Sequence, residues 1–375
     1  MTPFVKLLIS PRLIFFLQMI KVLVDLYRLK EVNSGLGYFS NQLSSSLIEN
    51  QTEDLGLTFM IPNSRGSKFS ISSNIVFASI FKMLFSRFNT GFDVWHSTSQ
   101  FPKVYPGSKT KFILTIHDLN FLIEKPNLQK KAKYLKKLQN KVDRADAITS
   151  ISLYTKTLIE EHISLHGKKV HVIHNGVESP ELFAYKRPQW ASNKKFFFSI
   201  GYFTAKKNWE VLIDMMTEFP DYNLIISGFN NTAYGKSCEN LIKQKGLNDR
   251  IVLSGTISNE EKSWLYAECS AFLFPSLAEG FGMPAVEAMK LGKPVFLSKF
   301  TSLPEIGGDA AFYFDNFDKK SMKLKITSGL QTYNADRKAH EDKIKSHVSK
   351  FDWDVAAKKY IELYKSFELL LLPTQ

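Results

Sequence analysis

The architecture of this 375-residue chain is clearest in one stretch, Phe274-Pro-Ser-Leu-Ala-Glu-Gly-Phe-Gly-Met-Pro-Ala-Val-Glu-Ala-Met-Lys290. Its apolar start, residues 271–274, predicts a strand that ends at a proline, and the second proline opens an Ala- and Met-rich segment typical of a helix first turn. Between strand and helix, Gly280 and Gly282 let a ligand approach the backbone closely. The free N–H groups of the first turn and the positive end of the helix dipole form a site for an anion such as a phosphate.

Two carboxylates flank this loop. Glu279 precedes the glycines, and Glu287 lies one turn into the predicted helix. Carboxylate oxygens accept the paired hydrogen bonds that the diol of a ribose or of a sugar ring donates. The stretch therefore predicts a phosphate-sized site with acids on either side that can hold sugar hydroxyls.

The two glutamates, taken together with the residues between them, resemble the donor-binding signature of the family-four retaining glycosyltransferases, which have the GT-B fold. The pattern consists of Glu279, seven residues and Glu287, with Gly280-Phe281-Gly282-x-Pro inside. The resemblance implies an α/β fold with two Rossmann-like domains whose parallel sheets face each other across a cleft. It also implies that the C-terminal domain holds a nucleotide sugar and the N-terminal domain the acceptor.

The composition is that of a soluble globular protein, with 44% hydrophobic and 23% charged residues and enough length for two domains. The two cysteines, Cys238 and Cys269, provide neither a disulfide framework nor metal-ligand spacing. We therefore expect a reducing, cytoplasmic environment and two cysteines that serve only in packing.

The net charge of +13 is unevenly spread, because residues 101–147 hold eleven Lys or Arg and four Asp or Glu. Leucines and a valine at helical spacing, with lysines away from them, predict an amphipathic helix with a basic face around residues 128–142. A solvated face is one interpretation. Peripheral contact with anionic lipid at the inner face of a membrane is another, worth about 1 kcal/mol for each basic residue near the surface. Nucleic acid is not expected as a partner, because no aromatic-interleaved motif accompanies the charge.

The N-terminal residues 1–18 are apolar and basic, but charged residues and a proline interrupt them before the ~18 to 20 residues that a membrane span needs. We interpret them as a loose tail or a spurious upstream start. Strand-like runs then alternate with helix-like segments, which is typical of parallel sheets covered on both faces. The expected divisions are an N-terminal domain at 19–185, a C-terminal domain at 186–352, and a C-terminal helix at 353–375 that, by resemblance, crosses back to the N-terminal domain.

A first glycine-rich turn follows the strand predicted at residues 21–26 and precedes a helix at residues 41–47. It fails as a dinucleotide fingerprint, because Ser40 occupies the third glycine position. The resemblance implies that Gly35 and Gly37 let the donor phosphate or the acceptor approach the backbone. The alternative is a tight turn that requires glycine.

A buried strand predicted at residues 112–117 ends in His117 and Asp118. Ligands of open α/β sheets bind outside the carboxyl ends of the strands, so both side chains should point into the cleft. The resemblance places His117 beside the donor sugar, whereas the role of Asp118 stays open.

A lysine pair follows the strand predicted at residues 195–201. Lys206 and Lys207 precede Asn208, a predicted helix cap, and positive charge at a helix start is unfavourable unless an anion binds there. The resemblance implies that both lysines bind the donor diphosphate. Lys206 stands where the similar variants have Arg, so it keeps the charge and loses the bidentate fork.

The reaction implied is transfer of a glycosyl group from a nucleotide diphosphate sugar to an acceptor hydroxyl, with retention and without a metal or other cofactor. His117, Lys207 and Glu279 are the expected catalytic residues. The lysines and the amides after Glu279 would stabilise the leaving diphosphate, while Glu279 holds sugar hydroxyls and Glu287 the ribose diol. The Asp-x-Asp string at residues 352–354 is better explained by helix capping than by metal binding, and Glu305 we interpret as structural.

Two other interpretations remain. The chain could be another sugar-nucleotide enzyme of GT-B shape, such as an epimerase or a phosphorylase, or a non-catalytic subunit that binds nucleotide sugars. The lysine pair and the His-Asp strand look most like mannosyltransferases of surface-polysaccharide pathways. The expected donor is therefore GDP-mannose, followed by UDP-hexoses, and the expected acceptor is a saccharide or a lipid-linked saccharide.

Overall fold

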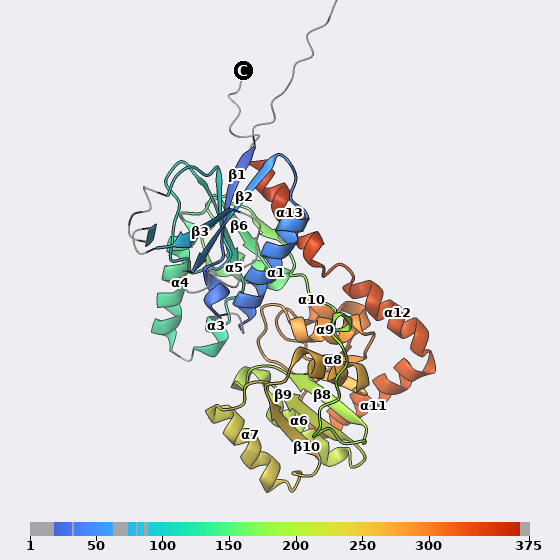
Figure 1. Ribbon diagram of the computed structural model, residues 1–375. Coiled ribbons are helices and arrows are strands. Elements are labelled where there is room, and N and C mark those ends of the chain that lie inside the picture. Colours follow the sequence, from blue (N-terminus) through green and yellow to red (C-terminus); the bar gives the residue numbers. More distant parts are fainter. Residues whose placement is uncertain are drawn as a thin grey trace, which may run out of the picture.

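The structure, a computed structural model, describes residues 19–31, 34–62, 74–79, 82–83, 85, 89–125 and 127–367. The predicted tail, residues 1–18, and the last residues of the predicted C-terminal helix, 368–375, lie outside this part. The chain forms two parallel sheets, one above the other in Figure 1, as the sequence predicts.

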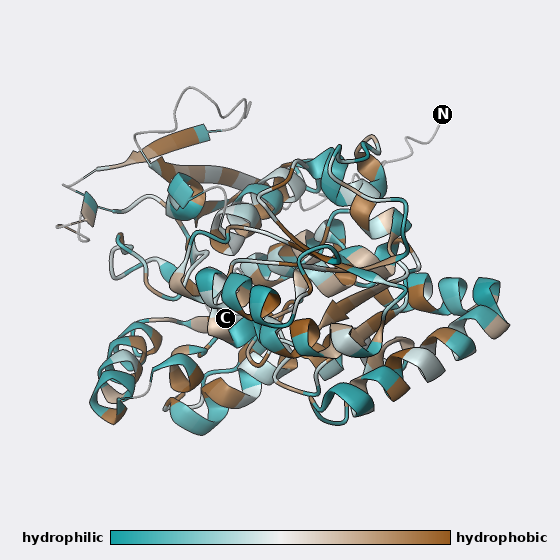
Figure 2. Ribbon diagram, turned by 90° about the horizontal axis from the view of Figure 1, so that it is seen from below, coloured by the Kyte–Doolittle hydropathy of each residue, from teal (hydrophilic) through white to brown (hydrophobic). Residues whose placement is uncertain are grey.

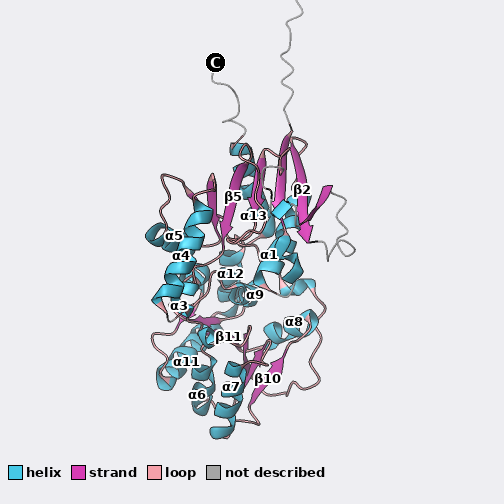
Figure 3. Ribbon diagram, turned by 90° about the vertical axis from the view of Figure 1, so that its left-hand side faces the viewer, coloured by secondary structure: helices cyan, strands magenta, loops and turns pink. Residues whose placement is uncertain are grey.

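The N-terminal sheet has seven strands in the order β3-β2-β1-β4-β5-β6-β7, and all neighbours pair in parallel. The strands are nearly continuous apolar runs because both faces are covered by helices (Figure 3). The strands are β1 (Ile20–Asp25), β2 (Leu55–Pro62), β3 (Asn74–Ala78), β4 (Val94–Ser97), β5 (Lys111–Ile116), β6 (Ala147–Ser150) and β7 (Val170–Val172), and the helical segments are η1 (Tyr27–Glu31), α1 (Gly35–Glu49), α3 (Phe121–Glu124), α4 (Leu128–Val142) and α5 (Leu153–His162).

Helix α1 begins at Gly35, six residues before the predicted start. Ser34 explains this, because its Oγ accepts a hydrogen bond from the Gly37 N–H at 3.0 Å and caps the first turn. Neither Gly35 nor Gly37 has a positive φ. The backbone conformation of this turn therefore does not itself require glycine.

The C-terminal sheet has six strands in the order β10-β9-β8-β11-β12-β13, again all parallel. Figure 2 shows hydrophobic residues concentrated along the strands and hydrophilic residues on the peripheral helices. The strands are β8 (Phe196–Ile200), β9 (Asn223–Ser227), β10 (Ile251–Gly255), β11 (Ala271–Phe274), β12 (Val295–Leu297) and β13 (Phe312–Tyr313). The helical segments are η4 (Pro180–Leu182), η5 (Ala205–Lys207), α6 (Trp209–Met215), η6 (Met216–Glu218), α7 (Ala233–Gln244), α8 (Asn259–Glu268), α9 (Met283–Lys290), α10 (Leu303–Gly307), η7 (Gly308–Ala310), α11 (Lys319–Ala335) and α12 (Arg337–Val348).

The last described helix, α13 (Trp353–Ser366), packs on α1 and the N-terminal sheet (Figure 1). A buried polar chain joins it to the strands: His96 Nδ1 lies 2.7 Å from the Tyr364 hydroxyl, and His96 Nε2 lies 2.7 Å from Thr115 Oγ1. Asp352 caps the helix by accepting from the Asp354 N–H at 2.8 Å, so the predicted cap is confirmed.

Both cysteines are buried and unpaired, as expected for packing residues. Within the described residues, no helix combines the length and the apolar character that a bilayer crossing requires.

Candidate functional site

The signature stretch forms the predicted strand, loop and helix, β11 followed by residues 275–282 and then α9, with a proline in the first helical turn. We call residues 275–282 the signature loop. The N–H groups of Gly280, Phe281 and Gly282 have no hydrogen-bond partner among the described residues. They precede the positive end of the α9 dipole, which makes this a suitable place for an anion.

Lys207 reaches this loop from η5. Its Nζ lies 2.7 Å from Glu279 Oε1 and 4.6 Å from the centre of the Phe274 ring. The two charged side chains are only 10% and 13% exposed, and the Ser276 hydroxyl donates to the same carboxylate oxygen at 2.6 Å. Gly201 leaves room for the lysine, because a Cβ there would lie 2.9 Å from Lys207 Cε. Thus Lys207 and Glu279, predicted to act together, are in direct contact.

Glu287 projects from α9 toward α8. Its carboxylate accepts from Lys262 Nζ at 2.8 Å and from the Tyr266 hydroxyl at 2.7 Å. Glu287 and Lys262 line a cavity of about 280 Å³ that reaches Tyr38 of the N-terminal domain. The acid is therefore paired, and it also faces open space between the domains.

Lys262 also lines a larger hollow of about 760 Å³. The rings of Tyr202 and Phe229 stack at 5.3 Å there and are both exposed. Ile257 and the glycine after β9, Gly228, complete an apolar surface of the size and character that suit an aromatic base.

His117 lies at the carboxyl end of β5, as predicted, and is 6% exposed. Its Nε2 donates to Thr98 O at 2.8 Å, and the Phe39 ring packs edge-on at 4.7 Å. Burial lowers the pKa of His117 to about 4, so the ring is neutral at physiological pH. The signature loop rests on this residue, since a Cβ at Gly280 would lie 2.6 Å from His117 O.

Asp118 is partly buried, and burial raises the pKa of its carboxyl group. Its Oδ1 accepts from the Asn120 N–H at 3.0 Å, which is a local turn contact. Its role stays open between turn formation and ligand binding.

Lys206 contacts the N-terminal domain across the domain boundary. Its Nζ lies 2.8 Å from Glu124 Oε1 of α3. Burial acts to lower the pKa of Lys206, but the bond to Glu124 and the negative charges of Glu124, Glu279 and Asp118 together outweigh it, so the pKa is raised. The two predicted phosphate-binding lysines thus have different partners.

Asn208 occupies the N-cap position of α6, but its side chain makes no capping bond, so that part of the prediction is wrong. Its φ of 56° is left-handed, a conformation that Asn tolerates better than most residues. Its Nδ2 donates to Pro275 O at 3.4 Å and so ties the lysine turn to the signature loop.

The predicted glycines of the N-terminal domain face the signature helix. A Cβ at Gly35 would lie 3.7 Å from Met283 Cε at the start of α9. Gly37 follows in the same first turn of α1. The start of α1 therefore lies opposite the start of α9.

Two further acids stand out, and sequence reasoning missed the first of them. Asp25 ends β1, is 3% exposed, and burial raises its pKa to about 7. Its position at a strand end, like that of His117, is the signal that could have found it. Glu305, which we interpreted as structural, contacts the opposite domain through His174 and two amides of α5.

Comparison with known proteins agrees with this arrangement. Residues 57–179 match the family model Glycosyltransferase Family 4, and residues 183–346 match Glycosyl transferases group 1. With two parallel-sheet domains and a lysine turn against an acid-flanked loop, the protein is a glycosyltransferase of the GT-B class. The chain belongs to the family-four, group 1 glycosyltransferases.

Individual relatives are distant. The O-antigen chain mannosyltransferase RfbU of Salmonella typhimurium is 26% identical over 242 residues, which are 64% of this chain and 65%, just under two thirds, of RfbU. Sucrose-phosphate synthase of Thermosynechococcus elongatus superposes with a TM-score of 0.71 at 16% identity over 93% of this chain and 99% of its own. Anabaena HepE in complex with UDP-glucose gives a TM-score of 0.69 at 18% identity over 92% of this chain and 99% of its own.

Proposed function

We propose that this glycosyltransferase transfers a hexosyl group to a saccharide or a lipid-linked saccharide during assembly of a cell-surface polysaccharide. The donor we propose is GDP-mannose, from which a mannosyl group is transferred. The observation that carries the proposal is the contact between Lys207 and Glu279 beside the unpaired amides of the signature loop. The mannosyl donor is supported by the relative RfbU, an O-antigen chain mannosyltransferase. HepE, which binds UDP-glucose, supports a nucleotide sugar in general.

In the proposed reaction the bond between the anomeric carbon and the diphosphate oxygen breaks while the acceptor oxygen bonds to the same face of that carbon. The acceptor proton passes to the departing phosphate oxygen, so configuration is retained and no enzyme nucleophile is needed. Negative charge grows on the diphosphate. Lys207 and the amides of residues 280–282 are already fixed and partly shielded from water, so they stabilise that charge without reorganisation.

Glu279 has a second task in this scheme. When the diphosphate engages Lys207, the carboxylate loses part of its ion pair and can accept hydrogen bonds from the sugar hydroxyls. The two carboxylates lie in different elements, Glu279 in the signature loop and Glu287 in α9, and each has a cationic partner of its own. Neither is therefore proposed as the nucleophile of a hydrolase-like pair.

The nucleoside is assigned to the cavities beside Lys262. Glu287 would hold the ribose diol, and the hollow with Tyr202 and Phe229 would receive the base. No cofactor is proposed. Within the described residues, no group of three or more His, Cys, Asp or Glu is placed to hold a metal ion.

The acceptor side is assigned to the N-terminal domain, with helix α4 on a membrane surface. A hollow of about 540 Å³ between α3 and α4 is lined by four lysines, Lys125, Lys130, Lys133 and Lys137. None of them has a carboxylate within salt-bridge distance in the described part of the chain. Unneutralised charge of this density supports peripheral contact with an anionic lipid leaflet on the cytoplasmic side.

A panel of nucleotide sugars tests the function. GDP-mannose should raise the melting temperature more than UDP-glucose or UDP-galactose, because a ligand that binds only the native state stabilises it by mass action. The donor so identified is then incubated with saccharide acceptors, and NMR of the new anomeric centre should show retention. Failure of every nucleotide sugar to bind would overturn the proposal, and an inverted product would overturn its mechanism.

A further inference from the structure

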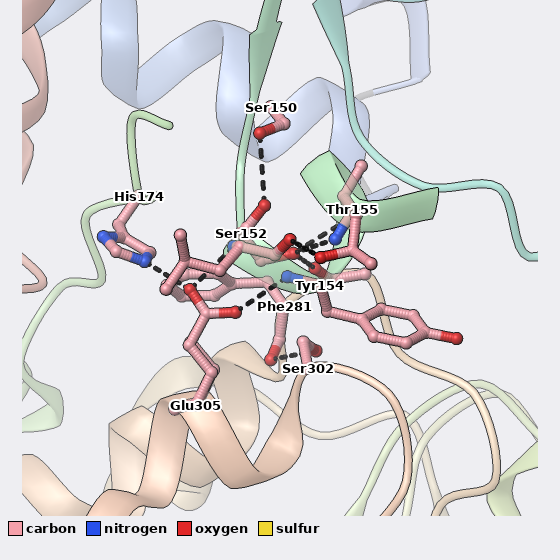
Figure 4. A network of polar contacts seen from close by, with 12 residues as sticks. Ser150, Ser152, Tyr154, Thr155, His174, Phe281, Ser302 and Glu305 are labelled. Carbon is pink, nitrogen blue, oxygen red and sulfur yellow. Dashed lines mark hydrogen bonds and ion pairs between the residues drawn. The ribbon is translucent and has the colours of Figure 1, made fainter. Parts of the chain in front are cut away.

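Two serines, one from each domain, hold the carbonyl groups of the signature loop (Figure 4). Ser152, between β6 and α5, donates from Oγ to Gly280 O at 2.8 Å. Ser302, at the start of α10, lies 2.8 Å from Phe281 O and 3.1 Å from Glu279 O. Three consecutive carbonyls of the loop are therefore turned toward serine hydroxyls.

This arrangement fixes the direction of the loop amides. In a trans peptide the C=O and the following N–H point in opposite directions, and no described peptide bond is cis. Holding the carbonyls of residues 279–281 therefore directs the N–H groups of residues 280–282 away from the two serines. These are the three amides that lack a partner within the described residues. Amides that are fixed and unpaired in this way can donate hydrogen bonds to a multivalent oxyanion such as a diphosphate.

Glu305 holds Ser152 in place from the other domain. Its carboxylate accepts from the Leu153 N–H at 2.8 Å and the Tyr154 N–H at 3.1 Å, which are the first-turn donors of α5. The same carboxylate lies 2.6 Å from His174 Nε2. Figure 4 shows Glu305 reaching from α10 to His174 and to the start of α5. A carboxylate at a helix N-terminus satisfies free amides and the helix dipole, so this contact fastens the helix that begins just after Ser152.

The ionised form of Glu305 is favoured. Burial acts to raise its pKa, but the bonds from His174 and from the α5 amides outweigh burial and lower it. Ser152 is completely buried, and the Glu305 side chain is 15% exposed. The contact is thus a largely dry, charge-assisted link between the domains rather than a surface ion pair.

We infer that Ser152 and Glu305 are positioning residues that couple domain closure to completion of the diphosphate site. When the domains separate, Gly280 O loses its partner from the N-terminal domain, and the peptide that carries the Phe281 N–H is free to turn. When they close, Glu305 docks α5, Ser152 reaches Gly280, and the third amide is directed with the other two. If closure strengthens diphosphate binding by a given factor, thermodynamic linkage requires that a bound diphosphate shifts the closure equilibrium toward the closed form by the same factor. This inference rests on the proposed function, in which a donor diphosphate binds these amides.

The test compares ligands with and without phosphates on the full chain. Dissociation constants of GDP and guanosine, and of UDP and uridine, are measured by competition for wild type, Ser152→Ala and Glu305→Gln. We expect diphosphate binding to weaken roughly 3- to 10-fold in Ser152→Ala and by about tenfold or more in Glu305→Gln, with nucleoside binding unchanged. Asp315→Asn is the matched control, because the ion-pair partners of Asp315 among the described residues, Lys299 and Lys325, both belong to its own domain.

The outcomes separate the two ideas. If wild type binds neither GDP nor UDP, the proposed function and this inference both fail. If wild type prefers the diphosphate over the nucleoside and both variants keep that preference, only this inference is overturned. An equal loss of diphosphate and nucleoside affinity would likewise overturn it, because it would indicate a merely structural role.

Discussion

Lys207 Nζ and Glu279 Oε1 lie 2.7 Å apart, at the point where the turn after β8 meets the signature loop. In the free protein each charge neutralises the other, so both can be held largely out of water. A donor diphosphate would compete for the lysine and release the acid. In the proposed function, Lys207 is therefore a preorganised cation and Glu279 its temporary counter-ion.

Removing the cation should abolish transfer. We predict that Lys207→Met lowers the transfer rate by at least about 100-fold, because the growing charge on the diphosphate loses a fixed partner. The initial rate with the identified donor measures this, and circular dichroism checks that the secondary structure is retained. Lys245→Met, which breaks an exposed ion pair with Asp214, should retain activity. Near-normal transfer by Lys207→Met would exclude the proposed role.

Sequence reasoning found the features that are local in the chain. The strand, loop and helix around Glu279 follow from apolar periodicity, glycine and proline, and so does the placement of His117 at the end of β5. It missed the contacts that join distant segments. Ser152 meets Gly280 across 128 residues, and Glu305 meets Leu153 across 152 residues. Nothing in the local pattern of either segment specifies its partner, because the packing of one domain on the other brings them together.

The partner of Lys206 could not be predicted from the sequence either, because it also lies far away in the chain. At a helix start both lysines look equivalent, and only the three-dimensional arrangement separates them. Lys206 faces Glu124 of α3, while Lys207 faces Glu279. Its predicted part in donor binding would require Lys206 to leave Glu124.

Glu287 should recognise the ribose. We predict that Glu287→Gln weakens binding of GDP or UDP by about tenfold, because a carboxylate that accepts two hydroxyl hydrogen bonds becomes an amide that accepts with one oxygen. The 2′,3′-dideoxy nucleotides, which lack the diol, should bind wild type and variant equally. Titration calorimetry with both ligand types measures the difference. Equal weakening of the dideoxy nucleotides would show that the change acts through Lys262 and Tyr266 instead.

Gly280 should tolerate no side chain. A Cβ at this position would lie 2.6 Å from His117 O, so we predict that Gly280→Ala pushes the signature loop away from the N-terminal domain. Transfer should fall at least about tenfold, while helix and sheet content stay the same. Gly246→Ala is the control: its φ of 64° makes alanine strained, but the space around it is open. It should lower the melting temperature without slowing transfer, and a fully active Gly280→Ala would refute the predicted steric clash.

The basic face of α4 should bind anionic membranes. Replacing Lys130, Lys133 and Lys137 with Gln should lower the affinity for phosphatidylglycerol vesicles by about 10²-fold, because each charge removed costs roughly 1 kcal/mol. Co-sedimentation with the vesicles measures this affinity. Binding by wild type should weaken as salt rises. A matched triple change on α11, at Lys319, Lys320 and Lys323, should have little effect. If both triple variants bind alike, the interaction is not specific to α4.

Acid should destabilise the protein through its buried histidines. The pKa of His96 is lowered by burial from 6.5 to about 3, and that of His117 to about 4. Below pH 6.5 the unfolded chain therefore takes up protons that the native state excludes, so stability falls as the pH decreases. Asp25, whose pKa burial raises to about 7, acts in the opposite direction and offsets part of the loss.

The variant His96→Gln isolates one of these groups. Glutamine can still donate to one hydroxyl and accept from the other, where His96 meets Tyr364 and Thr115, but it does not titrate. Between pH 6 and 4 the wild type should lose up to about 1.4 kcal/mol of unfolding free energy per pH unit more than this variant. Urea unfolding at pH 7, 6, 5 and 4.5 measures the difference. Parallel curves for the two proteins would mean that His96 is already protonated in the native state, and that the polar chain between β4 and α13 holds a charge rather than a neutral ring.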